Sequence, residues 1–402
     1  MPHLTLGKKV LIVSSWAPPR PGGSAQHLYN FFSQFDARMY AIYTREGVMR
    51  VSEPGPVLPC AYRFFPRSSA SMRVLSAAVS SVRTVAYGLR LVQDEQSEII
   101  YTTSDTGGGL TLGCLLSIMS RTPLVLHFFD MYRGNHLPSA WNLLSWLIEP
   151  AVLIHASIAI FPNEAIHTEY CRRYPWMKEK FFCINNGSFQ EPYESLRTRR
   201  TPHAPPHHIV ATGSVYWAQE ESMLCLAQAV HNTSDLVADL YVPRHVPEIL
   251  AKKLAANKSV RLASAPPQEM ARIQTKADIL FIPLARPGES PVVTLTAVPG
   301  KLPEYLLAGR PIVLQAPEQS FMAQYAKREG FAHVVTSYDP AKLRDEIRRV
   351  IADSAYSEKL VRNSLATFSR FHDASKNALR IAQLLTALPT KRHAGRSQYN
   401  SR

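Results

Sequence analysis

The chain has 402 residues, of which 46% are hydrophobic and 19% are charged. Its length exceeds what one hydrophobic core usually sustains, so two domains are predicted, and its balanced composition excludes a disordered or fibrous protein. Lys and Arg total 45 against 31 Asp and Glu, a net charge of +14 that suits an anionic partner: a nucleotide diphosphate, a nucleic acid or an acidic membrane surface.

The cysteines and the N-terminal segment both favour a cytoplasmic protein. The five cysteines are scattered and include no Cys-x-x-Cys pair, which argues for reduced thiols and against a disulfide framework or a structural zinc site. The apolar run 10–13 is too short for a signal peptide and predicts a first strand.

In the first half, short and continuously apolar runs alternate with helical patterns. This alternation is typical of a parallel sheet that is covered on both faces. Strands are predicted at 9–15, 40–44, 99–103, 123–129, 157–161 and 181–184, and helices at 25–35, 70–92, 110–119 and 164–173. Segment 141–161 is long enough to span a membrane, but Glu149 and Pro150 near its middle favour a buried helix, a loop and a strand.

A Pro-, Arg- and His-rich stretch at 191–208 predicts a linker between domains at 1–190 and 209–388, and a basic tail follows at 389–402. In the second domain strands are predicted at 209–212, 238–242, 260–262, 278–283 and 311–315, and helices at 221–230, 246–255, 268–276 and 302–307. The predicted fold class is therefore α/β, with two doubly wound Rossmann-like domains facing a cleft.

The first candidate site follows the first strand, where a Pro/Gly loop leads into a helix near Ser24. Backbone N–H groups and a positive helix end would meet there at the carboxyl edge of the sheet. Gly22 and Gly23 would let a ligand approach the backbone, although a tight turn explains the two glycines equally well.

Two further motifs lie at the ends of predicted strands. His127 and Asp130 follow the strand at 123–129, where an imidazole could contact a sugar hydroxyl or move a proton, or could be a packed core histidine. The sequence Asn185-Asn186-Gly187 favours a turn that requires a positive φ.

The most informative segment is 294–317. Gly300 precedes a short helix, so the N–H groups near Lys301 and the Lys301 ammonium form a predicted diphosphate site. Glu304 is placed to accept hydrogen bonds from a vicinal diol such as ribose. The alternative is that Lys301 and Glu304 are a solvated i,i+3 pair.

KLPEYLLAGRPIVL, at 301–314, resembles the nucleotide-binding signature of retaining glycosyltransferases of family 4, which have the GT-B fold. Other resembling elements follow in the same order along the chain: Pro21-Gly22-Gly23, the His127 strand, Glu149, the Asn185-Asn186-Gly187 turn, and the segments 211–216 and 277–290.

The resemblance implies roles for individual residues. His127 would touch the transferred sugar and Lys301 the diphosphate, which makes these two the catalytic candidates. Glu304 would bind the ribose, and Arg286 would be a second phosphate contact or a contact to the base. The donor-binding set is Gly22, Gly23, Gly213, Arg286, Gly300, Lys301 and Glu304. No metal-binding cluster or cofactor is predicted.

Two departures from the family pattern stand out. Thr296 occupies a position where the family often has a second glutamate, and the Arg and Lys that often follow the first strand of the second domain are absent from 211–222. Donor binding would then depend on Lys301, Arg286 and helix ends, and an inactive relative stays an alternative.

The resulting prediction is a cytoplasmic glycosyltransferase that moves a sugar from a nucleotide sugar to a saccharide or lipid-linked acceptor, in cell-surface polysaccharide or glycolipid synthesis. A nucleotide-sugar 2-epimerase is a second enzyme class for this fold, which Thr296 makes less favourable. A nucleic-acid-binding module is the non-enzymatic alternative, but the sequence has no motif that reads RNA or DNA.

A peripheral association with an anionic membrane surface is also predicted. Arg83 and Arg90 would share one face of the helix at 70–92, and Arg73 would lie nearby. A cationic stripe of this kind would hold the chain at an anionic leaflet. The alternative is a helix packed on the sheet with ordinary solvated arginines.

Overall fold

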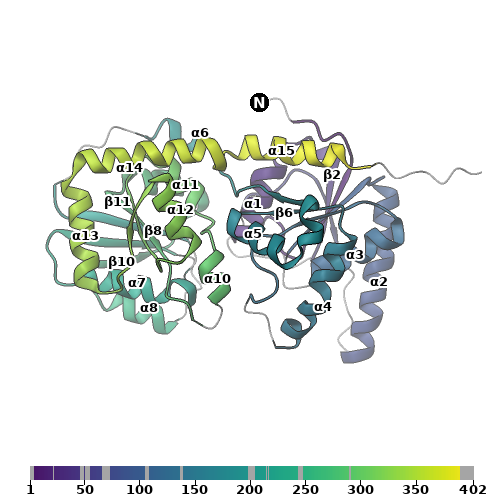
Figure 1. Ribbon diagram of the computed structural model, residues 1–402, viewed down its shortest axis with the longest axis horizontal. Helices are drawn as coiled ribbons and strands as arrows, with labels where there is room; N and C mark the ends of the chain where they lie inside the picture. The colour runs from purple at the N-terminus through teal and green to yellow at the C-terminus, as the bar shows by residue number, and fades with distance from the viewer. Residues whose placement is uncertain are drawn as a thin grey trace, which may run out of the picture.

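The computed structural model describes residues 4–20, 22–45, 49, 55–65, 73–104, 108–135, 139–197, 204–213, 215, 217–242, 248–288 and 291–389, with the side chains of 73–80, 139–141 and 217 left out. One third of the predicted linker, at 198–203, and almost all of the predicted tail, at 390–402, lie outside these residues. The described chain forms two α/β domains that lie side by side (Figure 1).

The N-terminal domain is built on a seven-stranded parallel sheet, ordered β3-β2-β1-β4-β5-β6-β7. The strands β1, β2, β4, β5 and β6 are buried along their whole length because helices cover both faces of the sheet. Their bounds are β1 (Val10–Val13), β2 (Tyr40–Thr44), β3 (Ala61–Phe64), β4 (Ile99–Thr103), β5 (Leu124–His127), β6 (Ile158–Phe161) and β7 (Phe181–Cys183).

On one face of this sheet, α2 (Arg73–Asp94), α3 (Gly108–Ser120), α4 (Ser139–His155) and α5 (Glu164–Arg173) enclose one hydrophobic cluster. On the other face, α1 (Gly23–Phe32) covers a second cluster. Two short 3-10 helices, Ala37–Met39 and Pro175–Lys180, complete the domain.

The C-terminal domain has a six-stranded parallel sheet, ordered β10-β9-β8-β11-β12-β13. Its strands are β8 (His207–Thr212), β9 (Leu236–Tyr241), β10 (Val260–Ala263), β11 (Ile279–Pro283), β12 (Ile312–Gln315) and β13 (Ala332–Val335). The predicted fold class, two doubly wound Rossmann-like domains, is confirmed.

One face of the second sheet packs on α7 (Trp217–Ala229), α8 (Glu248–Ala255) and α13 (Pro340–Ala352). The other face packs on α9 (Met270–Lys276), α11 (Leu302–Leu307) and α12 (Phe321–Glu329), and a 3-10 turn (Pro267–Glu269) precedes α9. The short helices α6 (Glu191–Glu194) and α10 (Pro291–Thr296) connect elements, and α14 (Ser354–Thr367) runs along the outside.

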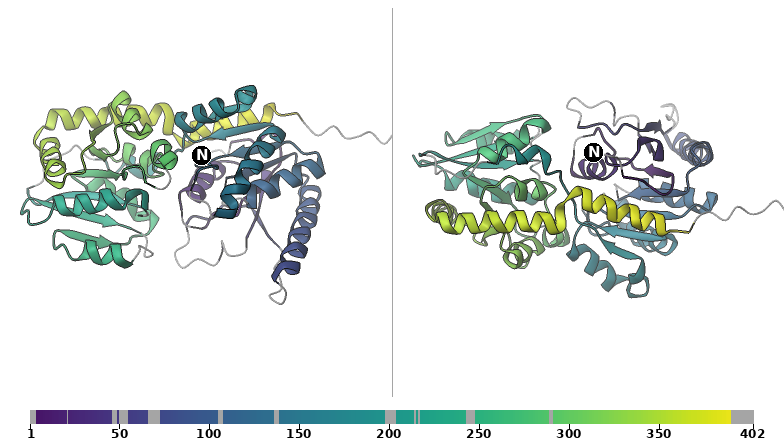
Figure 2. Two further views of the ribbon diagram at one scale, coloured as in Figure 1. Left: turned by 60° about the horizontal axis from the view of Figure 1, so that its bottom comes forward. Right: turned by 90° about the horizontal axis from the view of Figure 1, so that it is seen from above.

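The last helix, α15 (Ala374–Ala387), leaves the second domain and packs against α1 of the first (Figure 2). Ala378, Ile381 and Leu385 follow one another at spacings of three and four residues, so they share one side of the helix and join the cluster beneath α1. The predicted range 209–388 therefore contains the second sheet but also a helix of the first domain, because the apolar stripe of α15 fits the uncovered side of β1 and α1.

The chain passes between the domains twice, and the two passages lie together. The Asn186 carbonyl accepts from His372 Nδ1 at 2.7 Å, and Ser188 N–H donates to the His372 carbonyl at 3.0 Å. Gly187 does not have the predicted positive φ. It is needed for close approach instead, because a Cβ there would lie 2.8 Å from the Ala374 backbone.

Segment 141–161 follows the prediction of a helix, a loop and a strand, since α4 ends at His155 and β6 begins at Ile158. Glu149 and Pro150 both lie inside α4. Among the helices of the described chain, none is both long enough and apolar enough to cross a bilayer.

Candidate functional site

The two domains meet where the carboxyl edges of their sheets face each other. The loop after β1 leads into α1, and the segment after β11 leads through α10 to α11. A Cβ on Gly300, just before α11, would lie 3.2 Å from Nε2 of His27 and 3.7 Å from Cα of Gly23. The predicted ligand sites at Gly22 and Gly23 and at Gly300 are therefore neighbours across the interface. This edge of the sheet is where doubly wound folds bind their ligands.

Gly22 and Gly23 differ in what they permit. Gly22 has a φ of 140°, a conformation that favours glycine, and Trp16 Nε1 would lie 3.2 Å from an added Cβ. Apart from its chain neighbours and the backbone of α1, no heavy atom of the described residues would lie within 4 Å of a Cβ on Gly23. The N-terminus of α1 thus has a tight turn followed by backbone that is open to a ligand.

Lys301 is anchored beneath the end of β8. Its Nζ donates to the Thr212 carbonyl at 2.6 Å, and its Cδ lies 3.8 Å from where a Cβ on Gly213 would be. Gly213 has a φ of 99°. The surrounding protein lowers the pKa of the Lys301 ammonium to about 8, against the opposing effect of the Glu304 carboxylate. Gly213, Gly300 and Lys301 are therefore brought together.

Glu304 is held from a different side. Its Oε2 accepts a hydrogen bond from Gln274 Nε2 at 3.0 Å, and among the described residues Oε1 has no hydrogen-bond partner. Desolvation raises the pKa of this carboxyl group. Tyr305, the next residue, accepts from Thr212 N–H at 2.8 Å and so ties α11 to the end of β8. One carboxylate oxygen therefore has no partner among the described residues and could accept from a diol.

Arg286 has a partner already. Its backbone N–H donates to Glu221 Oε2 at 3.0 Å, its Nε donates to Glu221 Oε1 at 2.7 Å, and its guanidinium lies over the Tyr338 ring. A contact to a donor phosphate would have to compete with Glu221. Of the other residues after β8, Ser214 and Tyr216 lie outside the described residues.

His127 is fully buried at the end of β5. Its Nδ1 is hydrogen-bonded to the Tyr101 hydroxyl at 2.5 Å, and its ring packs 4.5 Å from that of Phe129. Among the described residues, Nε2 has no hydrogen-bond partner. Burial, reinforced by His27, lowers the pKa of His127 to about 3, so the ring is neutral. The imidazole therefore lies beneath aromatic side chains, with one nitrogen uncommitted.

Asp130 follows β5 in the first domain, and Thr296 belongs to the second domain. Asp130 is exposed to water, but protein surrounds it at longer range and the resulting desolvation raises its pKa to about 6. Thr296 ends α10, and its carbonyl accepts from Asn163 Nδ2 of the first domain at 3.1 Å. Its hydroxyl donates to the Val292 carbonyl at 2.7 Å. The position that differs from the family is therefore a contact between the domains.

Several side chains of this site were not predicted from the sequence. His27 lies one helical turn after Gly23, a spacing that could have placed it beside the glycines. Asn163 caps α5 by accepting from Ile166 N–H, and the cap pattern gave no sign of its second contact to Thr296. Gln274 had no local signal, because its partner Glu304 is distant in sequence.

A comparison with protein-family models and one with curated protein sequences each found no match. Solved structures do match. HepE from Anabaena, in complex with UDP-glucose, has a TM-score of 0.72 at 16% identity, covering 95% of this chain and 100% of HepE. A glycosyltransferase from Rickettsia africae has a TM-score of 0.67 at 10% identity, covering 95% and 100%.

WaaG, a glycosyltransferase involved in lipopolysaccharide biosynthesis, has a TM-score of 0.64 at 14% identity, covering 94% of this chain and 100% of WaaG. Identities this low show the fold and leave the roles of individual residues as predictions. The chain has the GT-B fold, the pair of Rossmann-like domains that these glycosyltransferases share.

Proposed function

We propose that the protein is a glycosyltransferase that moves a sugar from a nucleotide-sugar donor to an acceptor. The observation that carries the proposal is the grouping of Lys301, Glu304 and Gly213 at the carboxyl edge of the second sheet, facing Gly23 and His27 of the first domain. The complex of HepE with UDP-glucose, which has the same fold, supports a donor of this class.

In the proposed arrangement the second domain binds the donor. Glu304 accepts hydrogen bonds from the ribose hydroxyls through the oxygen that Gln274 leaves without a partner. Lys301 stabilises the negative charge that develops on the diphosphate as it leaves, in a site where the surrounding protein strengthens the interaction. Arg286 is a weaker candidate because Glu221 already pairs with it.

The first domain would bind the acceptor and touch the sugar. His127 Nε2 is the proposed sugar contact, which requires the aromatic side chains that bury it, Phe129 among them, to move when the sugar binds. Because the ring is neutral, it would act as a hydrogen-bonding group and not as a cation. Closure of the domains would exclude water that otherwise hydrolyses the donor. Retention of the anomeric configuration is proposed from the family resemblance, and the proposal includes no metal ion or cofactor.

We further propose that the protein works in the cytoplasm, peripheral to the membrane, in polysaccharide or glycolipid synthesis. The excess of basic residues and the shared fold with WaaG, a protein of lipopolysaccharide biosynthesis, support this setting. The acceptor would then be a saccharide or a lipid-linked saccharide.

Calorimetry with a panel of UDP-, GDP- and ADP-sugars tests the proposal directly. We expect one nucleotide sugar to bind and the matching nucleoside diphosphate to bind as well, since most contacts are to the nucleotide. Incubating the bound donor with saccharide and lipid-linked acceptors should then transfer the sugar. Interconversion of the donor without any acceptor would show an epimerase instead, and a failure to bind any nucleotide would contradict the proposal.

A further inference from the structure

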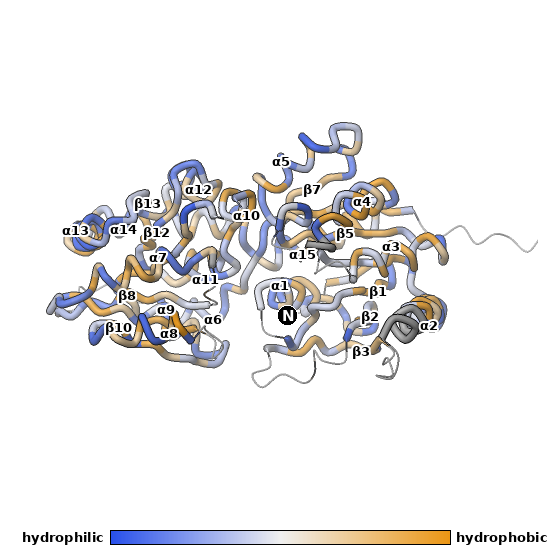
Figure 3. Tube along the Cα trace, turned by 90° about the horizontal axis from the view of Figure 1, so that it is seen from below, coloured by the Kyte–Doolittle hydropathy of each residue, from blue (hydrophilic) through white to orange (hydrophobic). Residues whose placement is uncertain are grey.

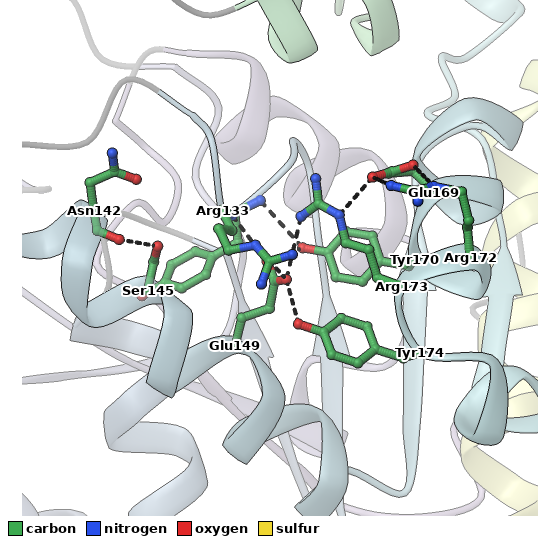
Figure 4. A network of polar contacts seen from close by, with 10 residues as sticks. Arg133, Asn142, Ser145, Glu149, Glu169, Tyr170, Arg172, Arg173 and Tyr174 are labelled. Atoms are coloured by element: carbon green, nitrogen blue, oxygen red, sulfur yellow. Dashed lines mark hydrogen bonds and ion pairs between the residues drawn. The ribbon is translucent and has the colours of Figure 1, made fainter.

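Helix α4 carries its single acidic residue on its inner side. Glu149 is completely buried and accepts hydrogen bonds from the hydroxyls of Tyr170 at 2.9 Å and Tyr174 at 2.8 Å. The backbone N–H of Arg133 donates to it at 3.0 Å, and the Arg173 guanidinium lies 3.5 Å away (Figure 4). The acid of α4 is thus fully engaged inside the domain, and none is left for the outer side.

The outer side of α4 is apolar and exposed. Leu143, Trp146, Leu147 and Ile154 are 75%, 58%, 72% and 62% exposed. Their spacings of three, four and eleven residues place them on one side of the helix. A helix that is apolar all round is normally buried on all sides. The outer side of α4 therefore lacks the covering that its composition requires.

Helix α3, which packs beside α4, extends this surface. Leu115, Ile118 and Met119 are all exposed there. Figure 3 shows α3 and α4 with long hydrophobic stretches in the same part of the molecule. We name as the α3–α4 face the exposed side chains of Leu115, Ile118, Met119, Leu143, Leu144, Trp146, Leu147 and Ile154.

Charged side chains lie around the α3–α4 face but not within it. No Asp, Glu, Lys or Arg side chain that the structure describes on α3 or α4 is exposed. Around it, Arg121 follows α3, and Lys180 donates to the carbonyl of Ile154 at 3.3 Å. Arg83 and Arg90 are exposed on α2, which packs against α3. The pattern is an apolar surface with a basic margin, as in proteins that lie on anionic bilayers.

We infer that the α3–α4 face docks the protein onto an anionic lipid bilayer. A second copy of the chain is a less suitable occupant, because a symmetric contact would bring the basic margin of one copy against that of the other. The inference deepens the proposed peripheral role, yet binding to a bilayer does not require the transfer reaction.

The position of the face suits a lipid-borne substrate. Next to Trp146, residues Arg133 and Arg173 border a hollow of about 370 Å³, which Val292 of the second domain also lines. The apolar face thus reaches the interface between the domains. A bilayer on this face would lie beside the interface between the two domains.

The docking surface differs from the one predicted from the sequence. There, the arginines of the helix at 70–92 were the proposed contact. Arg73 lies outside the side chains that the structure describes, while Arg83 and Arg90 are exposed on α2. These two now form part of the margin, and the apolar side chains of α3 and α4 supply the surface that enters the bilayer.

Vesicle sedimentation without donor or acceptor tests the inference. The wild-type chain is mixed with phosphatidylcholine vesicles, with or without phosphatidylglycerol, beside a Leu143→Ser/Leu147→Ser variant. Ile249→Ser is the matched control, because Ile249 is 72% exposed, as Leu147 is, but lies on α8 of the second domain. Both changes affect exposed side chains, and circular dichroism checks that the fold is retained.

We expect the wild type and the control to bind vesicles that contain phosphatidylglycerol, and the double variant to bind at least about tenfold more weakly. An Arg83→Gln/Arg90→Gln variant should weaken binding less and reduce its dependence on salt. Equal binding by the double variant, or no binding by the wild type, would overturn the inference. A dimeric wild type together with a monomeric double variant would also overturn the inference, since that would identify a second copy as the occupant.

A calorimetric measurement of nucleotide-sugar binding on the same samples keeps this result separate from the proposed activity. The double variant should bind the donor as the wild type does, because its substitutions lie outside the proposed donor site. If the wild type binds the donor but no vesicles, the docking inference is wrong and the proposed transfer function stands.

Discussion

Lys301 and Glu304 lie one turn apart at the start of α11, yet each is held by a different neighbour: the ammonium by the Thr212 carbonyl and the carboxylate by the Gln274 amide. They are therefore not the solvated i,i+3 pair that the sequence left as an alternative. The surrounding protein lowers the pKa of Lys301 and raises the pKa of Glu304, so it favours the neutral form of each group. An anionic ligand beside Lys301 would relieve the cost of keeping the ammonium charged there.

Glu304→Gln should weaken donor binding by about 1 to 3 kcal/mol, because it replaces a charge-assisted hydrogen bond to the ribose by a neutral one. The fold should persist, since a glutamine of the same shape can still accept from Gln274. Calorimetry with the nucleoside diphosphate measures the difference. The same substitution at Glu318, an exposed residue outside the site, provides the control. Equal affinities for the Glu304 variant and the wild type would remove its ribose-binding role.

Donor affinity should fall as the pH rises through about 8. Without a ligand Lys301 has a pKa of about 8, and a bound diphosphate would raise this pKa, so binding near pH 8 takes up protons. Calorimetry in buffers of different ionisation enthalpy counts these protons. A Lys301→Gln variant should bind more weakly and take up fewer protons. Proton release on binding by the wild type would contradict the assignment.

His127→Ala should reduce turnover more than nucleoside diphosphate affinity, because His127 lies in the first domain and the nucleotide contacts lie in the second. Tyr101→Phe is the informative companion, since it removes the Nδ1 partner and leaves the ring in place. We expect Tyr101→Phe to retain most of the turnover. Should His127→Ala merely lower stability, with normal kinetics in the folded fraction, the imidazole would be a core residue.

Stability should decrease as the solution becomes more acidic than about pH 6.5. His27, His127 and His372 are buried, and burial is the main reason that their pKa values fall to about 3, 3 and 4, from 6.5. The unfolded chain therefore binds more protons than the folded chain in this range, and stability is lost as pH falls. Three such groups give a slope that approaches about 4 kcal/mol per pH unit.

Urea denaturation between pH 4.5 and 7 measures this slope. His372→Gln should lower it by about one third, because one of the three groups is removed. His231→Gln, at an exposed position, should leave it unchanged. A slope that His372→Gln does not alter would show that carboxyl groups dominate the acid sensitivity.

Gly187→Ala should destabilise the protein by about 1 to 3 kcal/mol, because the added methyl group would lie 2.8 Å from the Ala374 backbone where the two passages meet. Gly288→Ala is the matched control, since beyond its chain neighbours no described heavy atom would lie within 4 Å of a Cβ there and its φ is not positive. Thermal unfolding compares the two. Similar stabilities for both variants would mean that the passages can separate at little cost.

The order of the strands and helices follows from local patterns, which explains why most elements were predicted. Continuous apolar runs such as 10–13 identify central parallel strands, because only a strand covered on both faces can be apolar throughout. The edge strand β3 was missed because its residues, Ala61–Phe64, are only half-buried and form no apolar run. Helix bounds differ by a few residues where caps are weak, as at α1.

Interactions between distant segments were harder to predict. The apolar stripe of α15 indicates a covered face but does not name the sheet that covers it, so this helix was assigned to the second domain. Asn-Gly suggested a positive φ at Gly187, whereas the actual requirement is the absence of a side chain beside α15. His27 and Gln274 were overlooked because each acquires its place in the site only through the packing of other elements.

The return of α15 to the first domain has a consequence for synthesis on the ribosome. The cluster beneath α1 includes Ala378, Ile381 and Leu385, which are translated after every strand of the second sheet. The first domain therefore cannot complete its core when its own strands have emerged, as a domain translated without interruption could. Its apolar surface beside α1 stays open while the whole second domain is made, and a nascent chain stalled before Ala374 should be a substrate for chaperones.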